Sequence, residues 1–495
     1  MRAPLQTMGM AAAQKAPAQP RLSYGFLQQV AQYLGLALLV LSPFARDPIA
    51  FAVGGITPWI LLKLVGRPGM PAAVGYYVLW QWLQIYAREL QTLVDGEALA
   101  RGIYGPTVER AYWYMLASIV TIAACYRLVL GNLPARISQR GLHETWRTQD
   151  LLTLYIASAF FAALCHIAGN SAGSLAQPLE VLANIKILGI MVLFITVLAT
   201  GRGYKMMLGA MGFEVVSGFT GILGDFRGVF IFLASAAIAA RIRWTGIMAF
   251  GAIVWMVVLL VLGVFWTAVK VQYREVATQS NDSQNIKTPV SERLGYLGGR
   301  AASADQIDWL DASYALLARL AYVDIFGSVI SVKEISPEPG YMRQWNDALE
   351  HVLKPRFLFP GKAALSDTEV FMRLARGDAS EEMRGGTSIS VGYMAENFVD
   401  LDFPGMLIGI AALGLVGAAV LRYFVTLKVP WVIREALGMS FVYAICHDGV
   451  EISLPKLLGA TLMFFLVFAP LVRFGLPIVL RWLGKRSELA QIQAV

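Results

Sequence analysis

The stretch TGIMAFGAIVWMVVLLVLGVFWT, residues 245–267, contains no charged side chain. An apolar helix of about 20 residues is long enough to cross the hydrocarbon core of a bilayer. The whole chain shares this character, because 57% of its 495 residues are hydrophobic and only 15% are charged. Soluble domains carry about 25% charged residues, which cover their water-exposed surfaces. The sequence therefore predicts an all-α polytopic membrane protein.

Twelve apolar runs of comparable length are predicted to span the membrane. They cover residues 26–44, 49–66, 71–87, 111–130, 150–169, 181–200, 205–222, 227–242, 245–267, 404–423, 434–451 and 456–480. The runs within 205–242 are short, so two spans or one re-entrant hairpin both fit them. The first run ends in Arg46-Asp47 without a small-residue cleavage site, which indicates an uncleaved helix.

Lysine and arginine occur in alternate gaps between these runs. One side of the predicted bundle receives Lys63, Arg67, Arg136, Arg140, Arg147, Arg202, Lys205, Arg241, Arg243, Lys428, Arg434, Lys485 and Arg486. Because cytoplasmic loops are rich in Lys and Arg, this side and both termini are predicted to be cytoplasmic. The basic 132–149 segment is assigned to membrane lipid contact. The net charge of +8 is thus explained by topology, and no nucleic-acid partner is expected.

The predicted organisation has five parts: a tail (1–25), nine spans (26–267), a large outer loop (268–403), three spans (404–480) and a second tail (481–495). The loop holds 14 basic and 19 acidic residues. Apolar periodicity predicts helices in 306–330 and 341–353, and Ser366 with Glu369 fits a capping box that opens a helix at 367–376. We expect a mostly helical cap on the outer face.

Metal or cofactor chemistry is not expected from the sequence. Cys125, Cys165 and Cys446 lie inside apolar stretches, and the four histidines are scattered. Neither residue type shows the spacing of a metal site or of a disulfide framework.

Arg227 lies in the Gly-rich turn 221–228 between two predicted spans. An Arg at the edge of the apolar zone is costly unless it is paired or functional. It either snorkels or pairs with Asp225, or its guanidinium binds a phosphate through two parallel hydrogen bonds.

The second basic feature is the stretch KPRFLFPGK, residues 354–362. Its prolines favour an extended segment, from which Lys354, Arg356 and Lys362 point away from an apolar Phe-Leu-Phe sequence. A solvated basic loop is the alternative, but the apolar triplet favours docking against the bundle.

Small and hydroxylated residues, including Thr387 and Ser388, lead into a predicted helix that carries Glu396 and Asn397. A carboxylate here can act as a general base or can form a structural ion pair, and the sequence leaves both open. His447 stands beside acidic residues at a predicted span end, where bonding to a neighbour is more common than catalysis.

Together these features resemble the O-antigen polymerase (Wzy-type) and O-antigen ligase superfamily of bacterial envelope proteins. The resemblance rests on the many spans with one large late loop, the turn 224–228, the stretch 356–362 and residues 390–405. Glu396-Asn397 stands where ligase-like relatives carry a His-Asn pair, with Gly405 and Gly409 in the following turn. A carboxylate at this place is closer to the repeat-unit polymerases.

The resemblance implies a GT-C-like fold in the bacterial inner membrane, with the large loop in the periplasm. It implies metal-independent transfer of a glycan from undecaprenyl diphosphate to the non-reducing-end hydroxyl of another lipid-linked repeat unit. Arg227 and Arg356 would hold the diphosphate, and Glu396 would act as the base. Further substrate contacts would come from Lys362, Lys354, Asn397, Thr387, Ser388 and His447. A chain-length regulator and a flippase of the same pathway are candidate partners.

Two alternatives remain at this stage. A ligase would transfer the finished glycan to another acceptor. A transporter or flippase would also have many spans, but transporters usually contain related halves, whereas nine runs precede the large loop here and three follow it.

Overall fold

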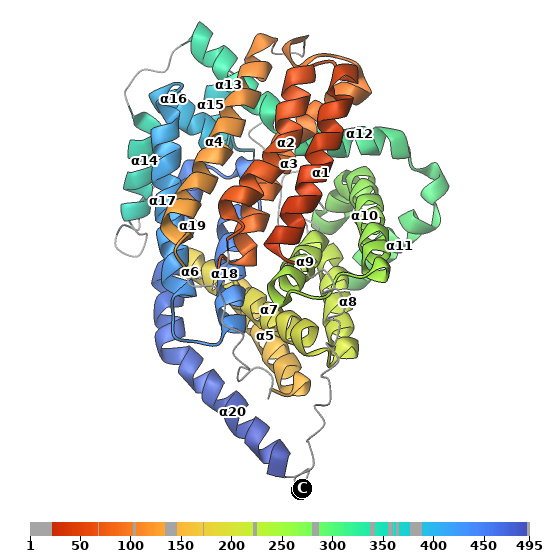
Figure 1. Cartoon of the computed structure of the whole chain (residues 1–495), viewed down its shortest axis with the longest axis vertical. Coiled ribbons are helices and arrows are strands. Elements are labelled where there is room, and N and C mark those ends of the chain that lie inside the picture. The colour runs from red at the N-terminus through yellow and green to blue at the C-terminus, as the bar shows by residue number, and fades with distance from the viewer. Residues whose placement is uncertain are drawn as a thin grey trace, which may run out of the picture.

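The computed structural model describes residues 22–67, 69–101, 105–133, 146–171, 173–220, 225–279, 287–336, 342–354, 359, 361–362, 366–376 and 389–492. Within these ranges the regular secondary structure is helical and contains no strand. The helices form an elongated bundle with α20 (Leu476–Ile492) at its lower end in the view of Figure 1.

In the described part of the chain, ten α-helices precede the large loop. They are α1 (Tyr24–Leu41), α2 (Pro48–Val65), α3 (Ala72–Asp95), α4 (Pro106–Leu130), α5 (Thr148–Ser171), α6 (Ala176–Ala183), α7 (Ile185–Thr200), α8 (Tyr204–Thr220), α9 (Gly228–Ala240) and α10 (Gly246–Thr278). After the loop come α17 (Met406–Val425), α18 (Trp431–Cys446), α19 (Leu454–Pro470) and α20 (Leu476–Ile492).

Within the described part of the chain, eight helical segments are long and apolar enough to cross a membrane. They are Tyr24–Phe44, Pro48–Val65, Pro106–Leu130, Thr148–Gly169, Ala176–Thr200, Gly246–Thr278, Met406–Val425 and Leu454–Lys485. The other four predicted spans also lie on helices, namely α3, α8, α9 and α18, but these are shorter or more polar. The predicted count of twelve spans thus goes beyond these eight.

The surface of α10 shows how the bundle meets its surroundings. Its large apolar side chains are exposed, and Ile247, Phe250 and Leu260 are among them. Apolar patches of this kind are unfavourable in water but suit contact with lipid chains. The interior of the bundle, in contrast, is filled by fully buried aromatic side chains such as Tyr112, Phe441 and Phe464.

The large loop contains α11 (Val290–Ala302), α12 (Trp309–Leu320), α13 (Val323–Ile335), α14 (Arg343–Leu353), α15 (Asp367–Ala375) and α16 (Tyr393–Leu401). The three predicted helical regions are confirmed, although 306–330 is divided into α12 and α13, which meet at an angle of 55°. The capping box is also confirmed, since Ser366 Oγ accepts a hydrogen bond of 3.3 Å from the Glu369 backbone N–H.

Helices α10 and α18 are among those whose boundaries differ from the prediction. Helix α10 continues past 267 to Thr278, because residues 268–278 contain no Gly or Pro to end it. Helix α18 ends at Cys446, whereas the apolar run was predicted to continue to 451. Residues 447–453 therefore form a connection beyond the α18 helix, and this connection contributes to the candidate site.

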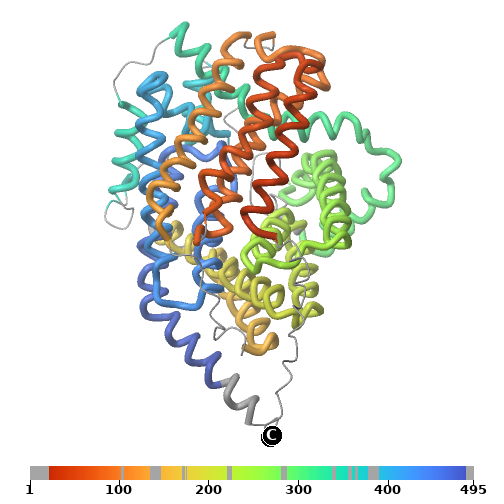
Figure 2. Tube along the Cα trace, viewed as in Figure 1, coloured from red at the N-terminus to blue at the C-terminus, as the bar shows by residue number. Residues whose placement is uncertain are grey.

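Segments that were predicted to lie on the outer side contact one another. The Leu99 backbone N–H donates to Asp47 Oδ2 (2.7 Å), and the Arg88 Nε lies 2.9 Å from Asp324 Oδ1. These contacts join the α1–α2 and α3–α4 connections to each other and α3 to α13. In Figures 1 and 2, α13, α15 and α16 accordingly gather at the upper end of the bundle.

At the opposite end, the Leu22 N–H donates to the Ile242 carbonyl (2.8 Å), and the Arg422 guanidinium donates to the Val129 carbonyl. Both contacts join segments that were predicted to lie on the same side of the membrane, whereas the topology as a whole stays a prediction. Which end faces the cytoplasm stays a prediction from the positive charges.

Candidate functional site

The connection between α18 and α19 lies against α3, and Gln84 of α3 holds it in place. The Gln84 amide nitrogen donates to the Asp448 carbonyl (3.1 Å) and to Glu451 Oε1 (3.3 Å). Its amide oxygen accepts from the Val450 N–H (2.9 Å). One side chain thus orients three successive parts of this connection, including the Glu451 carboxyl group.

Two glycines allow this close approach. Gly449 has φ of +67°, and a Cβ there would lie 1.8 Å from the Gln84 amide oxygen. Gly392, just before α16, has φ of +84°, and a Cβ there would lie 2.3 Å from the Val450 carbonyl oxygen. A side chain at either position would be strained and would push the connection away.

Arg227 immediately precedes α9 and faces the same connection. Its guanidinium carbon lies 5.4 Å from the centre of the Trp80 ring, and Nη2 donates to the His447 carbonyl over 3.4 Å. The Arg227 side chain is exposed, and Trp80 lies one helical turn before Gln84 on α3. The alternative ion pair with Asp225 involves a side chain outside the described ones.

Glu451 is half-buried in this setting. Burial raises its pKa to about 7, with Asp448 acting in the same direction, while Arg319 of α12, Arg227 and His447 oppose the rise. The carboxyl group therefore changes its charge near neutral pH, beside cations contributed by three different parts of the chain.

His447 contacts a neighbour, as the alternative interpretation expected. Its Nε2 lies 3.2 Å from Asp448 Oδ2. Burial alone would raise the pKa of Asp448, but His447, Arg227 and Lys456 hold it below its ordinary value. Asp448 is thus the ionised carboxylate of this region, and Glu451 is the one that titrates.

We call this group of side chains the mouth cluster. It consists of Trp80, Gln84, Arg227, Arg319, His447, Asp448 and Glu451.

Glu396 lies beside the mouth cluster on α16, but its carboxyl group faces inward and is 2% exposed. Its Oε2 accepts a hydrogen bond of 2.5 Å from the Leu454 N–H at the start of α19. The hydroxyl of the N-cap residue Ser453 makes no capping hydrogen bond to this helix. The Glu396 carboxyl group caps the helix instead. Burial raises the Glu396 pKa to about 8 and Asp367 and Asp400 add to the rise, whereas the hydrogen bond from Leu454 and the charge of Arg373 oppose it. These contacts favour a structural role over the predicted role as base.

Asn397 joins three helices. Its Oδ1 accepts from the Trp345 indole N–H of α14 (3.0 Å), and its Nδ2 donates to the Tyr393 carbonyl (2.8 Å). A Cβ on Gly409 of α17 would lie 1.9 Å from the Asn397 Oδ1. The absence of a side chain at Gly409 therefore allows α16 to pack closely on α17. Gly409 lies inside α17 and not in the preceding turn, where it was predicted.

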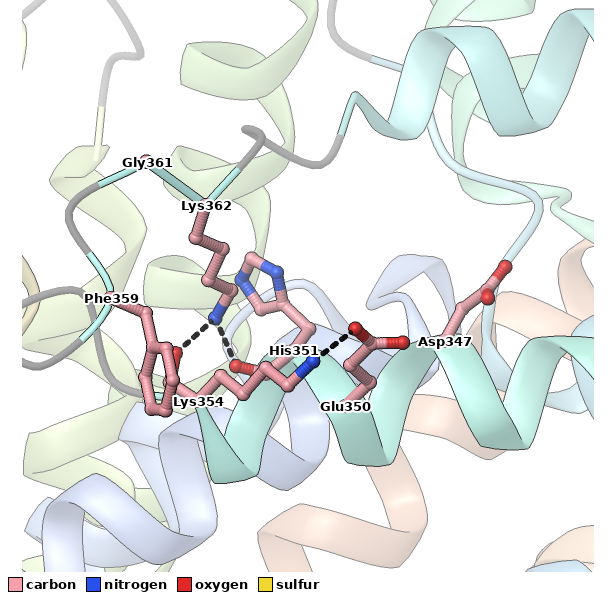
Figure 3. A pocket seen from close by; sticks show the side chains of 7 residues that line it. All are labelled: Asp347, Glu350, His351, Lys354, Phe359, Gly361 and Lys362. Atoms are coloured by element: carbon pink, nitrogen blue, oxygen red, sulfur yellow. Dashed lines mark hydrogen bonds and ion pairs between the residues drawn. The ribbon is translucent and has the colours of Figure 1, made fainter.

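The predicted basic residues Lys354 and Lys362 form a separate group at the end of α14 (Figure 3). Lys354 Nζ lies 2.6 Å from Glu350 Oε1, and Lys362 Nζ donates to the carbonyls of Lys354 (2.9 Å) and His351. Both ammonium groups thus stabilise this helix end. Phe359 joins them in lining a pocket of about 430 Å³. Arg356, Thr387 and Ser388 lie outside the described residues.

The structure therefore brings Arg227 and His447 together, places Glu396 and Asn397 on the next element, and leaves the two lysines in their own group. Four residues of the mouth cluster were not predicted from the sequence, namely Glu451, Gln84, Trp80 and Arg319. One usable signal was present, because Gln84 is one of two glutamines in a mostly apolar predicted span, where polar side chains usually have a specific role.

Among the described residues, no group of three or more His, Cys, Asp or Glu side chains is arranged to hold a metal ion. Cys125, Cys165 and Cys446 are buried free thiols.

The fold and its apolar helices define a polytopic helical membrane protein. No family model, curated protein or solved structure matches the chain in comparisons with known proteins.

We predict that Glu396 makes the protein less stable at high pH. Because burial raises its folded-state pKa to about 8, its stabilising effect is complete below the unfolded-state value of about 4.5 and is lost as the pH rises to 8. The melting temperature of the purified protein in detergent should fall across this range. Glu396→Gln, which keeps the shape without the titration, should flatten the curve. If the melting temperature of the variant falls as steeply with pH as that of the unmodified protein, groups other than Glu396 cause the loss of stability.

Proposed function

We propose that the protein is a membrane glycosyltransferase of the GT-C type that polymerises lipid-linked repeat units. It would transfer a glycan from undecaprenyl diphosphate to the non-reducing-end hydroxyl of another lipid-linked unit on the periplasmic face, without a metal. The proposal includes the twelve-span topology. The observation that carries it is the mouth cluster, in which arginines from α12 and the start of α9 lie beside a carboxyl group that titrates near neutral pH.

The leaving group sets the first chemical requirement. When the bond between the anomeric carbon and the phosphate oxygen breaks, the diphosphate takes the electron pair and gains negative charge. Fixed cations stabilise this charge in the transition state, and the planar guanidinium group suits phosphate oxygens. The contacts of Arg227 with the Trp80 ring and the His447 carbonyl support this role, and Arg319 would be the second cation.

The attacking hydroxyl sets the second requirement. Its oxygen forms the new bond to the anomeric carbon, and its proton must pass to a base. A base works best when its pKa lies near the working pH. Glu451, with a pKa of about 7 and a carboxyl group oriented by Gln84, meets this condition better than the deeply buried Glu396.

The remaining predicted residues take supporting roles in this proposal. Lys354 and Lys362 shape the end of α14, and Asn397 fixes the helix next to the mouth cluster. Arg356, Thr387 and Ser388 stay as predicted substrate contacts.

The direct test uses purified protein and the lipid-linked saccharides that accumulate in membranes of a bacterium from which this gene has been deleted. Products are separated by size on a gel. A ladder of increasing length supports the polymerase, whereas a single addition to another acceptor indicates the ligase. Absence of any new glycosidic product with active lipid-linked substrate contradicts the proposed function.

A further inference from the structure

A pocket of about 340 Å³ lies at the end of α9 opposite to Arg227. Its walls come from the first residues of α1, the end of α2 and the end of α9, and they include Ser23, Arg67 and Arg241. Helix α9 has 13 residues, which separates this pocket from the mouth cluster by roughly 20 Å at the α-helical rise.

The charged side chains that line the pocket are both cationic. Arg67 and Arg241 both have exposed side chains and both line it. The described residues that line the pocket include no carboxylate. Two guanidinium groups in a concave site form a favourable environment for an anion with several oxygen atoms, such as a phosphate.

The start of α1 adds to this character. Ser23 caps the helix, because its hydroxyl accepts from the Phe26 N–H over 3.4 Å, and Tyr24 and Gly25 of the first turn line the pocket. The first turn of a helix carries backbone N–H groups and a partial positive charge that favour anions. This helix end and the two arginines therefore both favour the binding of an anion in the pocket.

The ends of α2 and α9 have the opposite polarity, but part of that polarity is already neutralised. The Gln28 amide nitrogen donates to the carbonyls of Leu62 (2.7 Å) and Gly66 (3.3 Å) at the end of α2. The backbone N–H groups of Arg241 and Ile242 donate to the last turn of α9. These carbonyl groups therefore have hydrogen-bond donors other than the arginine side chains.

Several contacts make the pocket a defined site. The Tyr24 hydroxyl donates to the Pro71 carbonyl (2.6 Å) and accepts from the Gly75 N–H (3.1 Å), which ties α1 to α3. The Leu22 backbone N–H donates to the Ile242 carbonyl, and the ring centres of Phe26 and Trp244 lie 5.3 Å apart. These contacts hold α1 beside the end of α9.

The backbone of Arg241 supports a role for its side chain. Its φ of +51° lies in the left-handed region, where Gly or Asn is more favourable than Arg. The turn after α9 alone would be formed more easily by either of those residues. The presence of Arg at this position, despite the less favourable backbone, fits a function of the guanidinium group.

We propose that this pocket binds the phosphate of an anionic phospholipid headgroup. The exposed apolar side chains of Val30, Tyr33 and Leu34, which follow the pocket along α1, provide a surface for the acyl chains. A free phosphate ion would make no use of that surface. The predicted topology also places the pocket at the cytoplasmic leaflet, where anionic lipids are abundant.

The test measures lipid binding by native mass spectrometry of the full chain in a neutral detergent, with phosphatidylglycerol, phosphatidylcholine and inorganic phosphate as separate probes. Phosphatidylglycerol should bind at least tenfold more tightly than phosphatidylcholine. The double variant Arg67→Gln/Arg241→Asn should lose this preference. Asn suits the left-handed backbone, so the loss is not explained by strain, and melting curves without lipid check the fold.

The matched control is Arg202→Gln/Arg243→Gln, which removes two exposed charges from the same end of the bundle but outside the pocket lining. It should keep the preference for phosphatidylglycerol. An equal loss in the control would overturn the proposal in favour of general surface charge. Inorganic phosphate that binds as tightly and displaces the lipid would overturn the headgroup assignment. None of these outcomes depends on glycan transfer.

Discussion

Replacing Arg227 by Ala should lower the rate of glycan transfer by about 100-fold or more. Removing one fixed donor from a developing negative charge typically has an effect of this size, because no mobile group replaces it in the transition state. Arg227 is oriented by the Trp80 ring and the His447 carbonyl, so its guanidinium is in place before the substrate arrives. The measurement is the initial rate with purified protein and lipid-linked saccharides.

Arg110 provides the control for this experiment. It lies on α4 with an exposed side chain, and its Nη1 is 2.6 Å from Glu334 Oε1. Exposed ion pairs contribute little to stability, and Arg110 takes no part in the mouth cluster. Arg110→Ala should therefore keep activity within about twofold of the unmodified protein. If Arg227→Ala also keeps full activity, the diphosphate is held elsewhere. Arg227→Lys should have a rate of glycan transfer between those of Arg227→Ala and the unmodified protein. Lysine keeps the positive charge but lacks the planar guanidinium group that binds two phosphate oxygens at once.

Glu451→Gln should lower the turnover number by roughly 100-fold to 10,000-fold, the usual contribution of a general base. The Gln side chain can still accept the hydrogen bond from Gln84, so the connection between α18 and α19 should keep its position. The unmodified enzyme should become faster as the pH rises through about 7, since the Glu451 carboxylate must lose its proton to accept another. The variant should lose this pH dependence.

Glu396→Gln is the matched comparison. Both substitutions exchange a carboxyl group for an amide, but Glu396 binds the start of α19 and is 2% exposed. We expect this variant to retain most of its activity and its rise near pH 7. The reverse result, with full activity in Glu451→Gln and none in folded Glu396→Gln, would return the role of base to Glu396, as the family resemblance implied.

Local signals account for the parts of the fold that were predicted. Hydropathy identified the apolar helices because membrane insertion selects for long apolar segments. The capping box at Ser366 was recognised because its partners are three residues apart in the chain. Helix α11 was missed because its sequence is polar and Gly-containing, and its Arg293 and Leu297 side chains are buried by contacts with distant segments.

The candidate site shows the same limit. Arg227 was predicted from its position in a turn, and His447 from its acidic neighbours. Glu451 was not selected, because its orientation depends on Gln84, which is 367 residues away in the chain. Glu396 was selected because it precedes a membrane span in a family-like segment, but the sequence could not reveal its hydrogen bond to Leu454.

The sequence by itself determined the class of the protein and the helical character of its large loop. These properties depend on hydropathy and capping, which act over a few residues. Only the tertiary structure decided which polar groups meet at the mouth cluster, and which of two carboxyl groups faces the cations there. The physical reason is that pKa and orientation depend on burial and on neighbours brought together by packing, and packing joins residues that lie hundreds of positions apart.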